Sequence, residues 1–269
     1  MSSLWANLLA LAVTFVIVGA ASLLVRRLLA NREPHYGSWG ATLSYVAAAY
    51  GVIVGFSILF LFGQYASARD AVGNEATSIG TAFDQATLFP QSQPSIQRAL
   101  ICYARVVPAY DWPAMAAHEG GSAKVDAAYQ TLVASVGVGD KPSTGALQAA
   151  TATNLVSQIG NISTARETRL VAAETRVPTM LWILLIGGGA FAVLLLFAVT
   201  MPARSPTQAV LVAMSAVFTV VMLLVVVALS EPFGTGGGRV TPQLIDETAA
   251  SMTSAATPAV GAPCAFDRQ

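Results

Sequence analysis

The stretch QAVLVAMSAVFTVVMLLVVVALS, residues 208–230, contains no charged residue over about six helical turns. Three similar stretches occur at Leu4–Val25, Ala41–Gly63 and Thr179–Thr200. Each has about 22 residues, which as an α-helix is roughly 33 Å long and matches the roughly 30 Å hydrocarbon core of a bilayer. Buried helices of soluble proteins have shorter apolar runs, nearer 10–14 residues. The four stretches therefore predict an all-α integral membrane protein with four transmembrane helices in two hairpins.

The composition supports this class. Of the 269 residues, 55% are hydrophobic and 10% are charged, whereas about 25% of the residues of a soluble domain are charged. The 14 basic residues balance the 14 acidic ones, so nothing indicates a nucleic-acid partner. The first apolar stretch lacks a basic n-region and is followed directly by Arg26 and Arg27, so we expect a retained helix rather than a cleaved secretory signal. The expected surroundings are a lipid bilayer.

The placement of charge predicts the orientation of these helices. The segment between the first two apolar stretches is net positive, and the short loop between the last two contains Arg204 and no acid. The long segment 64–178 and the tail after Ser230 are net negative. Short positive loops tend to remain in the cytoplasm. We therefore expect both termini and the long segment on the outer side of a cytoplasmic membrane.

Cys102 in the long segment and Cys264 near the C-terminus are the two cysteines of the chain. The charge-based orientation places both outside, where disulfides persist. A bridge between them would fasten the tail to the extramembrane domain and contribute roughly 3–5 kcal/mol in the chain-entropy model. The alternative is two unrelated thiols, with Cys102 in a helix core and Cys264 free.

The domain organisation follows from the same pattern. Residues 1–63 form the first transmembrane hairpin, and residues 179–230 form the second. Residues 64–178 form an extracytoplasmic helical domain, whose first and last helices extend membrane helices two and three. Residues 231–269 form an elbow, a short surface helix and a tail.

Inside segment 64–178, helical signals dominate. The helix from the second apolar stretch is expected to continue to Pro90. A second helix begins near Pro94 and ends at Asp111-Trp112-Pro113. Ser122 caps a third helix, and Ser143 or Thr144 starts a fourth.

The exit from the last apolar stretch reads ALSEPFGTGGGRVTP, residues 228–242. Glu231 and Pro232 are expected to stop the helix, because proline lacks an amide donor. Phe233 is expected at the membrane interface, and Gly236, Gly237 and Gly238 allow a sharp reversal into a surface helix at Gln243–Thr253. A mobile glycine gate is the alternative. The stretch lacks the lysine of a phosphate-binding loop and the last glycine of a dinucleotide-binding turn.

Catalytic and metal-binding patterns are missing from the sequence. The histidines, His35 and His118, fall in different segments, and the cysteines are scattered, so no metal cluster of usual spacing is indicated. No nucleophile elbow or paired acids suggest an active site. We therefore expect no enzyme activity and no cofactor. Asp111 and Glu119 are expected to be solvated surface acids.

Polar residues near the membrane exit are candidates for a pore mouth, because cationic side chains at a pore mouth favour anions. The candidates are Gln64, Arg69, Arg166 and Arg169. The alternative is that Arg166 and Arg169, one helical turn apart, form ion pairs with Glu75 or Asp84 on the neighbouring helix.

Several short phrases, taken in order, are similar to a known family. They are Tyr50-Gly51-Val52, Asn74-Glu75-Ala76, Asp111-Trp112-Pro113-Ala114-Met115, Ala165-Arg166-Glu167-Thr168-Arg169-Leu170, Leu181-Trp182 and Glu231-Pro232-Phe233 before Val240-Thr241-Pro242. Over roughly residues 40–255 the chain resembles a bacterial family of four-helix membrane proteins of unknown function, labelled bestrophin-like domain.

The resemblance implies a relation to bestrophins, which are pentameric anion channels. It implies a bacterial inner-membrane protein that forms homo-oligomers and a passive anion channel, with Phe56 and Phe60 as a candidate hydrophobic constriction. Bestrophins carry their large segment in the cytoplasm, whereas the charge pattern here predicts the outside. The alternative function is a non-conducting envelope scaffold, or an accessory subunit that binds an envelope protein partner.

Overall fold

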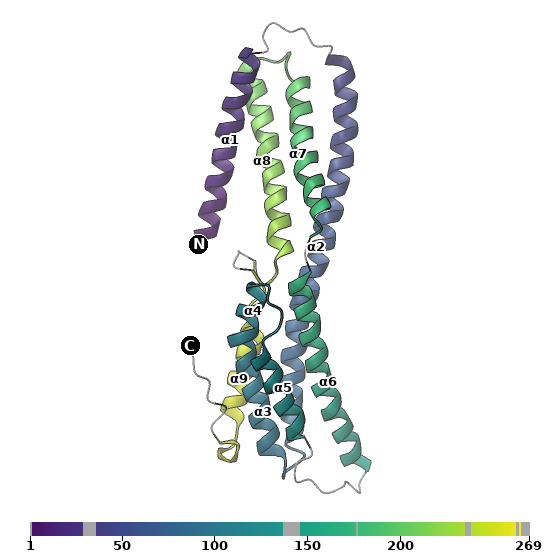
Figure 1. Cartoon of the computed structure of the whole chain (residues 1–269), viewed down its shortest axis with the longest axis vertical. Coiled ribbons are helices and arrows are strands. Elements are labelled where there is room, and N and C mark those ends of the chain that lie inside the picture. Colours follow the sequence, from purple (N-terminus) through teal and green to yellow (C-terminus); the bar gives the residue numbers. More distant parts are fainter. Residues whose placement is uncertain are drawn as a thin grey trace. The chain divides into compact units, whose positions relative to one another are not determined.

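The computed structural model describes residues 2–28, 36–136, 146–175, 177–234, 238–261 and 264. All regular structure in these ranges is helical, and they contain no strand (Figure 1). The chain divides into two compact units. The membrane unit comprises residues 1–63, 176–231 and 236–238, and the bundle unit comprises residues 64–175, 232–235 and 239–269. One helix, α2, runs through residues of both units.

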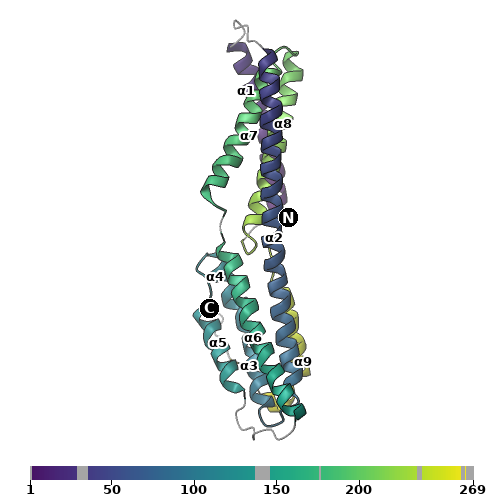
Figure 2. The same ribbon diagram turned by 90° about the vertical axis from the view of Figure 1, so that its right-hand side faces the viewer.

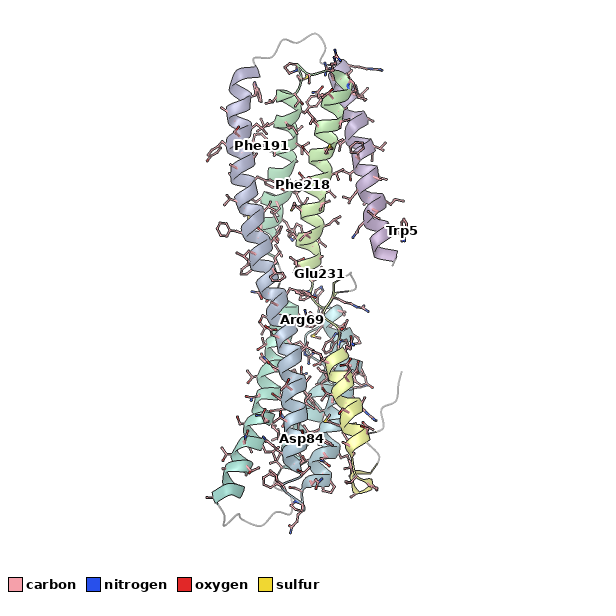
Figure 3. All side chains as sticks on the ribbon, turned by 180° about the vertical axis from the view of Figure 1, so that it is seen from behind. Trp5, Arg69, Asp84, Phe191, Phe218 and Glu231 are labelled. Carbon is pink, nitrogen blue, oxygen red and sulfur yellow. A yellow bond between two sulfur atoms is a disulfide. The ribbon has the colours of Figure 1, made fainter. Side chains whose placement is uncertain are left out.

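Four described helices are long and apolar enough to cross a membrane. They are α1 (Ser2–Leu28), α2 (Tyr36–Ala86), α7 (Thr179–Val199) and α8 (Ser205–Ser230). In their most apolar windows only 6% to 22% of the residues are buried by the protein itself. Large side chains such as Trp5, Phe191 and Phe218 are exposed (Figure 3). Since apolar surface of this extent is unfavourable in water, lipid or further protein must cover it. The chain is a membrane protein.

Within the membrane unit, α1 packs along α8, and α8 packs along α7 (Figure 1). The expected pairing of the first two membrane helices in a hairpin is not confirmed, because the partner of α1 is α8. Helix α2 meets α7 through Tyr50, whose ring lies against Gly188 and Gly189. A Cβ atom placed on Gly188 would be 2.9 Å from the Tyr50 ring, so glycine is what permits this approach.

The bundle unit combines the second part of α2 with shorter helices. They are α3 (Gln93–Val106), the π-helical turn η1 (Val107–Asp111), α4 (Trp112–Ala116), α5 (Ala123–Ser135), α6 (Ala146–Glu174), α9 (Gln243–Ala255) and the 3₁₀ turn η2 (Pro258–Val260). Helix α3 packs against α5 and α9 (Figure 2). Its Ile96 and Leu100 are buried with Ile79, Leu132 and Ile162 in one apolar core.

The expected end of the second bundle helix at Asp111-Trp112-Pro113 is wrong. The helical backbone continues from α3 through η1 into α4 and ends at Ala116. Pro113 lies in the first turn of α4, directly after the π-helical turn. The capping role of Ser122 is confirmed, since its hydroxyl accepts a hydrogen bond from the Lys124 amide at the start of α5.

The two predicted helix extensions differ in outcome. Helix α2 is continuous from Tyr36 to Ala86. Helix α6 instead ends at Glu174, and α7 begins at Thr179 after Pro178, which is extended at ψ 138°. A proline cannot donate the helical hydrogen bond and disfavours helix before it, so the backbone breaks here. The expected helix starts at Ser143 or Thr144 lie outside the described residues.

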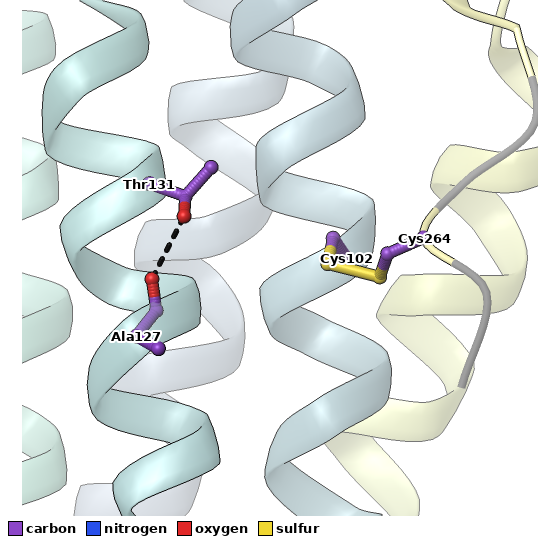
Figure 4. Close-up of a disulfide and its surroundings, with 4 residues drawn as sticks. All are labelled: Cys102, Ala127, Thr131 and Cys264. Carbon is purple, nitrogen blue, oxygen red and sulfur yellow. Dashed lines mark hydrogen bonds between the residues drawn. A yellow bond between two sulfur atoms is a disulfide. The ribbon is translucent and has the colours of Figure 1, made fainter. Parts of the chain in front are cut away.

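The C-terminal part of the chain is fastened to the bundle unit. Cys102 of α3 and Cys264 form a disulfide with their Cα atoms 5.4 Å apart (Figure 4), as expected from the sequence. Upstream, Ile245, Ala249 and Met252 of α9 are buried in the core. The Arg98 guanidinium donates to the Val260 carbonyl oxygen, so the segment after α9 is held at several points.

Candidate functional site

The bundle unit contains a cluster of buried charges. Glu75 comes from α2, Asp111 ends the π-helical turn η1, and Arg166 and Arg169 lie one turn apart on α6. The side chains of Glu75, Asp111 and Arg169 are 0% exposed, and that of Arg166 is 12% exposed. Buried ions of this kind are costly unless they are paired and hydrogen-bonded. Their partners therefore decide whether the cluster can exist.

Arg169 is paired with both buried carboxylates. Its Nε donates to Glu75 Oε2 at 2.9 Å, and its Nη2 donates to Glu75 Oε1 at 3.2 Å. The same Nη2 donates to Asp111 Oδ2 at 3.0 Å. The fork geometry on Glu75 is the strong bidentate arrangement of arginine and carboxylate. Arg169 thus joins α2, η1 and α6 through one guanidinium.

Arg166 completes the coordination of Asp111. Its Nε donates to Asp111 Oδ2 at 2.8 Å, and the Ser122 amide donates to Asp111 Oδ1 at 2.9 Å. Arg166 also pairs with Asp126 of α5, whose side chain is 60% exposed. Two guanidinium groups therefore balance the two fully buried carboxylates, and Asp126 adds a third carboxylate at the solvent side.

The glycines before Ser122 make room for this arrangement. A Cβ atom on Gly121 would be 2.9 Å from Arg166 Nη2 and 2.9 Å from a methyl group of Leu170. Gly120 has φ +79°, a conformation that side chains other than glycine rarely adopt. The turn between α4 and α5 can therefore approach α6 closely enough for the Ser122 amide to reach Asp111.

The electrostatics of the cluster favour the charged forms of Asp111 and Arg169. Burial opposes ionisation of Asp111, but hydrogen bonds from Arg166 and the Ser122 amide, together with the charge of Arg169, hold the pKa of Asp111 below its usual value. Burial likewise works against the charge of Arg169, and Glu75 and Asp111 outweigh it, so the pKa of Arg169 is raised.

Two aromatic residues extend the cluster. The Tyr103 hydroxyl donates to Glu75 Oε1 at 2.7 Å, and burial followed by the Glu75 charge raises the pKa of Tyr103 well above its usual value. The Trp112 ring lies 4.7 Å from the Arg169 guanidinium carbon, a cation–π contact. Arg169 thereby contacts the residue that follows Asp111 as well as Asp111 itself.

Trp112 in turn holds the segment that follows α8. Its Nε1 donates to the Val240 carbonyl oxygen at 3.2 Å, and its ring meets the Phe233 ring edge-to-face at 5.9 Å. The Val240 amide donates to the Pro232 carbonyl oxygen at 2.7 Å, which closes the elbow into a loop. The cluster and the elbow are thus neighbours within the bundle unit.

Comparison with known proteins agrees with this architecture. A family model described as bestrophin-like domain matches residues 8–245. The chain belongs to the bestrophin-like domain family. No curated protein matches the sequence.

Solved structures of a bacterial bestrophin homologue from Klebsiella pneumoniae share the fold of this bestrophin-like chain. One mutant of that homologue superposes with a TM-score of 0.74 at 11% identity, covering 92% of this chain and 99% of that chain. A second mutant gives 0.73 at 13% identity over 97% and 99%. A structure of the homologue phased on zinc gives 0.71 at 12% identity over 94% and 98%. At such identities the likeness concerns the fold.

Four of the six phrases that suggested the bestrophin-like family meet at this site. Glu75, Asp111 and Trp112, Arg166 and Arg169, and Phe233 with Val240 belong to four separate phrases of the sequence. Their side chains or backbones contact one another in a continuous series from Glu75 to Val240. These four phrases therefore correspond to one structural feature of the bundle unit.

The pore-mouth candidates divide into two groups. Arg169 is fully buried and Arg166 is nearly so, both in ion pairs, so the ion-pair alternative describes them and their guanidinium groups are not open to a passing ion. Glu75 is the partner of Arg169 only. Arg166 pairs instead with Asp111 and Asp126, which the ion-pair alternative did not name, and Asp84 is exposed on α2. Arg69 is exposed on α2 and Gln64 is partly exposed. These two are separate from the cluster and remain candidates.

The other candidates lie as follows. Phe56 and Phe60 are 68% and 60% exposed on α2. Glu231 is exposed at the end of α8, whereas Phe233 is buried at 4% exposure and its ring meets that of Trp112. The expected place of Phe233 at the membrane interface stays a prediction. Gly238 has φ +84°, as a sharp reversal requires. Gly236 and Gly237 lie outside the described residues.

Two functional residues escaped the sequence reasoning. Asp111 was expected on the surface because it sits in a turn-like context beside Trp112 and Pro113, and this expectation is wrong; Glu119 is exposed as expected. Tyr103 was not among the candidates, although its hydroxyl donates a hydrogen bond to Glu75. The sequence feature that could have predicted the burial of a second acid is the pair Arg166 and Arg169. Two arginines that face a helical core need more than one carboxylate to balance their charge.

Chemically, the arrangement is a charge-balanced clamp. In the described ranges no group of three or more His, Cys, Asp or Glu side chains could hold a metal ion. The buried carboxylates already accept hydrogen bonds from two arginines, a tyrosine and an amide. The clamp fixes α2, η1, α6 and the elbow against one another.

Proposed function

We propose that this bestrophin-like protein is a passive, homo-oligomeric ion channel selective for anions, and not an enzyme. Family membership is the observation that carries the proposal, and anion selectivity is what the resemblance to bestrophins implies. The membrane unit is compatible with it. In the sequence, segments 1–63 and 176–231 contain two acids, Glu33 and Glu231, neither of them inside an apolar stretch. Ionisable residues that mark proton-coupled transport are thus missing from the stretches themselves.

The need for further copies is supported by the exposed face of α2. Val52, Phe56, Leu59 and Phe60 follow one another at helical spacing and are 58% to 68% exposed. A single copy of the chain leaves these side chains uncovered. In a ring of copies, one such face from each copy would line the axis, where rings of aromatic residues can restrict an aqueous path by dewetting. Phe56 and Phe60 are the proposed constriction.

The proposed orientation places the bundle unit outside the cytoplasm. The disulfide between Cys102 and Cys264 supports it, because disulfides persist in oxidising compartments and are rare in the cytosol. Arg204 in the short loop between α7 and α8 supports the same orientation. To test this, whole cells are acid-quenched and treated with a maleimide-polymer reagent. We expect no mass shift before reduction and two added polymers after it; two polymers without reduction would contradict the orientation.

Chloride efflux from proteoliposomes tests the channel proposal. Purified full-length protein should release chloride faster than empty vesicles. Phe60→Ala should increase the rate, because it removes an aromatic ring from the constriction, whereas the matched substitution Phe218→Ala on α8 should leave it unchanged. Arg69→Ala should reduce the preference for chloride over potassium. Efflux equal to that of empty vesicles, from protein with an intact disulfide and a cooperative thermal transition, would refute the channel.

A scaffold or accessory role is the second candidate. One observation favours it: the bundle unit has a groove of about 520 Å³ between α2 and α9, lined by residues such as Gly80, Asp84 and Thr248. A partner protein of the envelope could bind there. In that case the protein would not conduct, and substitution of Gly80 by tryptophan would abolish co-purification of the partner without affecting thermal stability.

A further inference from the structure

One end of the membrane unit gathers cationic side chains. Arg26 and Arg27 lie in the last turn of α1, and Arg204 immediately precedes α8. Helix α1 packs along α8 (Figure 1). The Arg26 side chain also bonds the turn between α7 and α8, which joins the two groups. Arg27 and Arg204 are exposed.

Arg26 is anchored by neutral oxygen atoms. Its Nη1 donates to the Ala203 carbonyl oxygen at 2.6 Å and to the Gln208 side-chain oxygen at 2.8 Å. Gln208 is 1% exposed, and its amide donates to the Phe197 carbonyl oxygen at 3.0 Å. The guanidinium group is thus held in a fixed place by a buried glutamine, while its charge meets no carboxylate among the described residues. Arginine remains protonated, so the positive charge persists.

The acids of the membrane unit do not neutralise this end in the described ranges. Glu231 follows the opposite end of α8, a helix of 26 residues and so roughly 39 Å long. Glu33 lies outside the described residues. Among the described residues, the three guanidinium groups at this end therefore have no carboxylate partner, and an anion from outside the chain can bind them.

The start of α8 adds donors of its own. Arg204 is its N-cap residue and makes no side-chain capping hydrogen bond, and proline stands in the first turn. Amide groups at an uncapped helix start attract anions, and the helix dipole strengthens the attraction. The guanidinium N–H groups and the backbone amides at this helix start are hydrogen-bond donors. Phosphate oxygen atoms readily accept hydrogen bonds from both.

We propose that this arginine end, defined as Arg26, Arg27 and Arg204 with the first turn of α8, binds the phosphate headgroup of an anionic lipid. The ligand chemistry is a phosphodiester with an uncompensated negative charge. A lipid is favoured over free phosphate because α1 and α8 are bilayer-crossing helices. Their ends lie at headgroup depth, where phosphodiesters are concentrated. The inference does not depend on ion conduction.

Native mass spectrometry of the full-length protein in detergent tests the site. Phosphatidylglycerol and phosphatidylcholine with identical acyl chains are titrated separately, and the affinity of the first bound lipid is measured. Phosphatidylglycerol should bind more tightly. A basic residue near an anionic headgroup contributes about 1 kcal/mol, or about fivefold in affinity. The variant Arg27→Gln/Arg204→Gln should therefore lose roughly 25-fold in affinity for phosphatidylglycerol and little for phosphatidylcholine.

The variant retains Arg26, so the hydrogen bonds that join α1 to the α7–α8 turn persist and the fold is preserved. The matched control is Lys124→Gln/Arg239→Gln, which removes two exposed cations from the bundle unit and should leave lipid affinity unchanged. Equal affinity for the two lipids, or an unchanged preference in the arginine variant, would overturn the proposal. In a final competition experiment, inorganic phosphate is added at matched ionic strength to the protein with bound phosphatidylglycerol. Displacement of phosphatidylglycerol by millimolar phosphate would overturn the assignment to lipid.

Discussion

Replacement of Arg169 by methionine is the sharpest test of the buried cluster. Methionine has a similar length and no charge, so the change removes the partner of two carboxylates and leaves packing volume nearly constant. Glu75 loses both bonds of its bidentate pair and Asp111 loses one. Removing one partner of a buried ion pair costs about 3–5 kcal/mol, because a buried charge remains uncompensated. We expect a destabilisation of that size.

Thermal unfolding of the full-length protein in detergent measures the effect. For a unit of 150–250 residues, 1 kcal/mol corresponds to about 2–4 °C in Tm. The Arg169→Met variant should therefore unfold roughly 6–20 °C below the parent protein. Fluorescence of Trp112 reports on the correct region, because its ring contacts the Arg169 guanidinium. The matched control is Arg105→Met, an exposed arginine of α3 that should shift Tm by no more than a degree or two.

A second substitution separates charge from packing. In Glu75→Gln/Arg169→Met the remaining buried charges, Asp111 and Arg166, balance each other. The double variant should accordingly be more stable than the sum of the two single effects predicts, by about 1–3 kcal/mol. Additivity within about 0.5 kcal/mol, or a Tm of Arg169→Met within 2 °C of the parent, would refute the claim that charge compensation holds the cluster together.

Three further results are expected. Cys102→Ser should destabilise the bundle unit by roughly 3–5 kcal/mol, measured by thermal unfolding. It removes the disulfide with Cys264, which closes a loop with a sequence separation of 162 and so lowers the entropy of the unfolded chain. Gly121→Ala should cost about 1–3 kcal/mol in the same assay, because its Cβ atom would lie 2.9 Å from Arg166. The pKa of Asp111 is lower in the folded than in the unfolded state, so its contribution is complete above about pH 4 and is lost as the pH falls through the folded value. Melts from pH 7 downward should show this loss, and Asp111→Asn should flatten it.

Much of the membrane unit could be predicted from sequence because a bilayer imposes one length on every spanning helix. Apolar runs of about 22 residues leave few alternatives, and the helices at α7 and α8 begin and end close to the expected positions. The choice of neighbours could not be predicted. Which helix α1 contacts depends on shape, for example Gly19 against Ala213, and hydropathy contains no information on shape.

The buried cluster was only partly predictable, for a different reason. Charge spacing on α6 allowed an ion pair with Glu75, but Asp111 becomes buried only because the backbone stays helical through a π-helical turn that contains Pro108. Proline in a sequence favours a helix end. A π-helical turn accommodates the extra residue without ending the helix, and no local pattern announces it. The burial of Asp111 is thus a tertiary effect.

The cost of burying these charges clarifies what they do. A well-packed apolar cluster of the same volume would often be as stable, since desolvation consumes most of the attraction between ions. Apolar contacts, however, tolerate sliding of one helix along another, whereas the bidentate pair of Arg169 with Glu75 is satisfied at one register of α6 against α2. The same guanidinium positions Trp112, and Trp112 binds the backbone of Val240 in the elbow. The elbow is continuous with α8. Directional contacts therefore link two structural features. The register of α6 against α2, set by Arg169 and Glu75, is coupled through Trp112 to the position of Val240 in the elbow that follows α8.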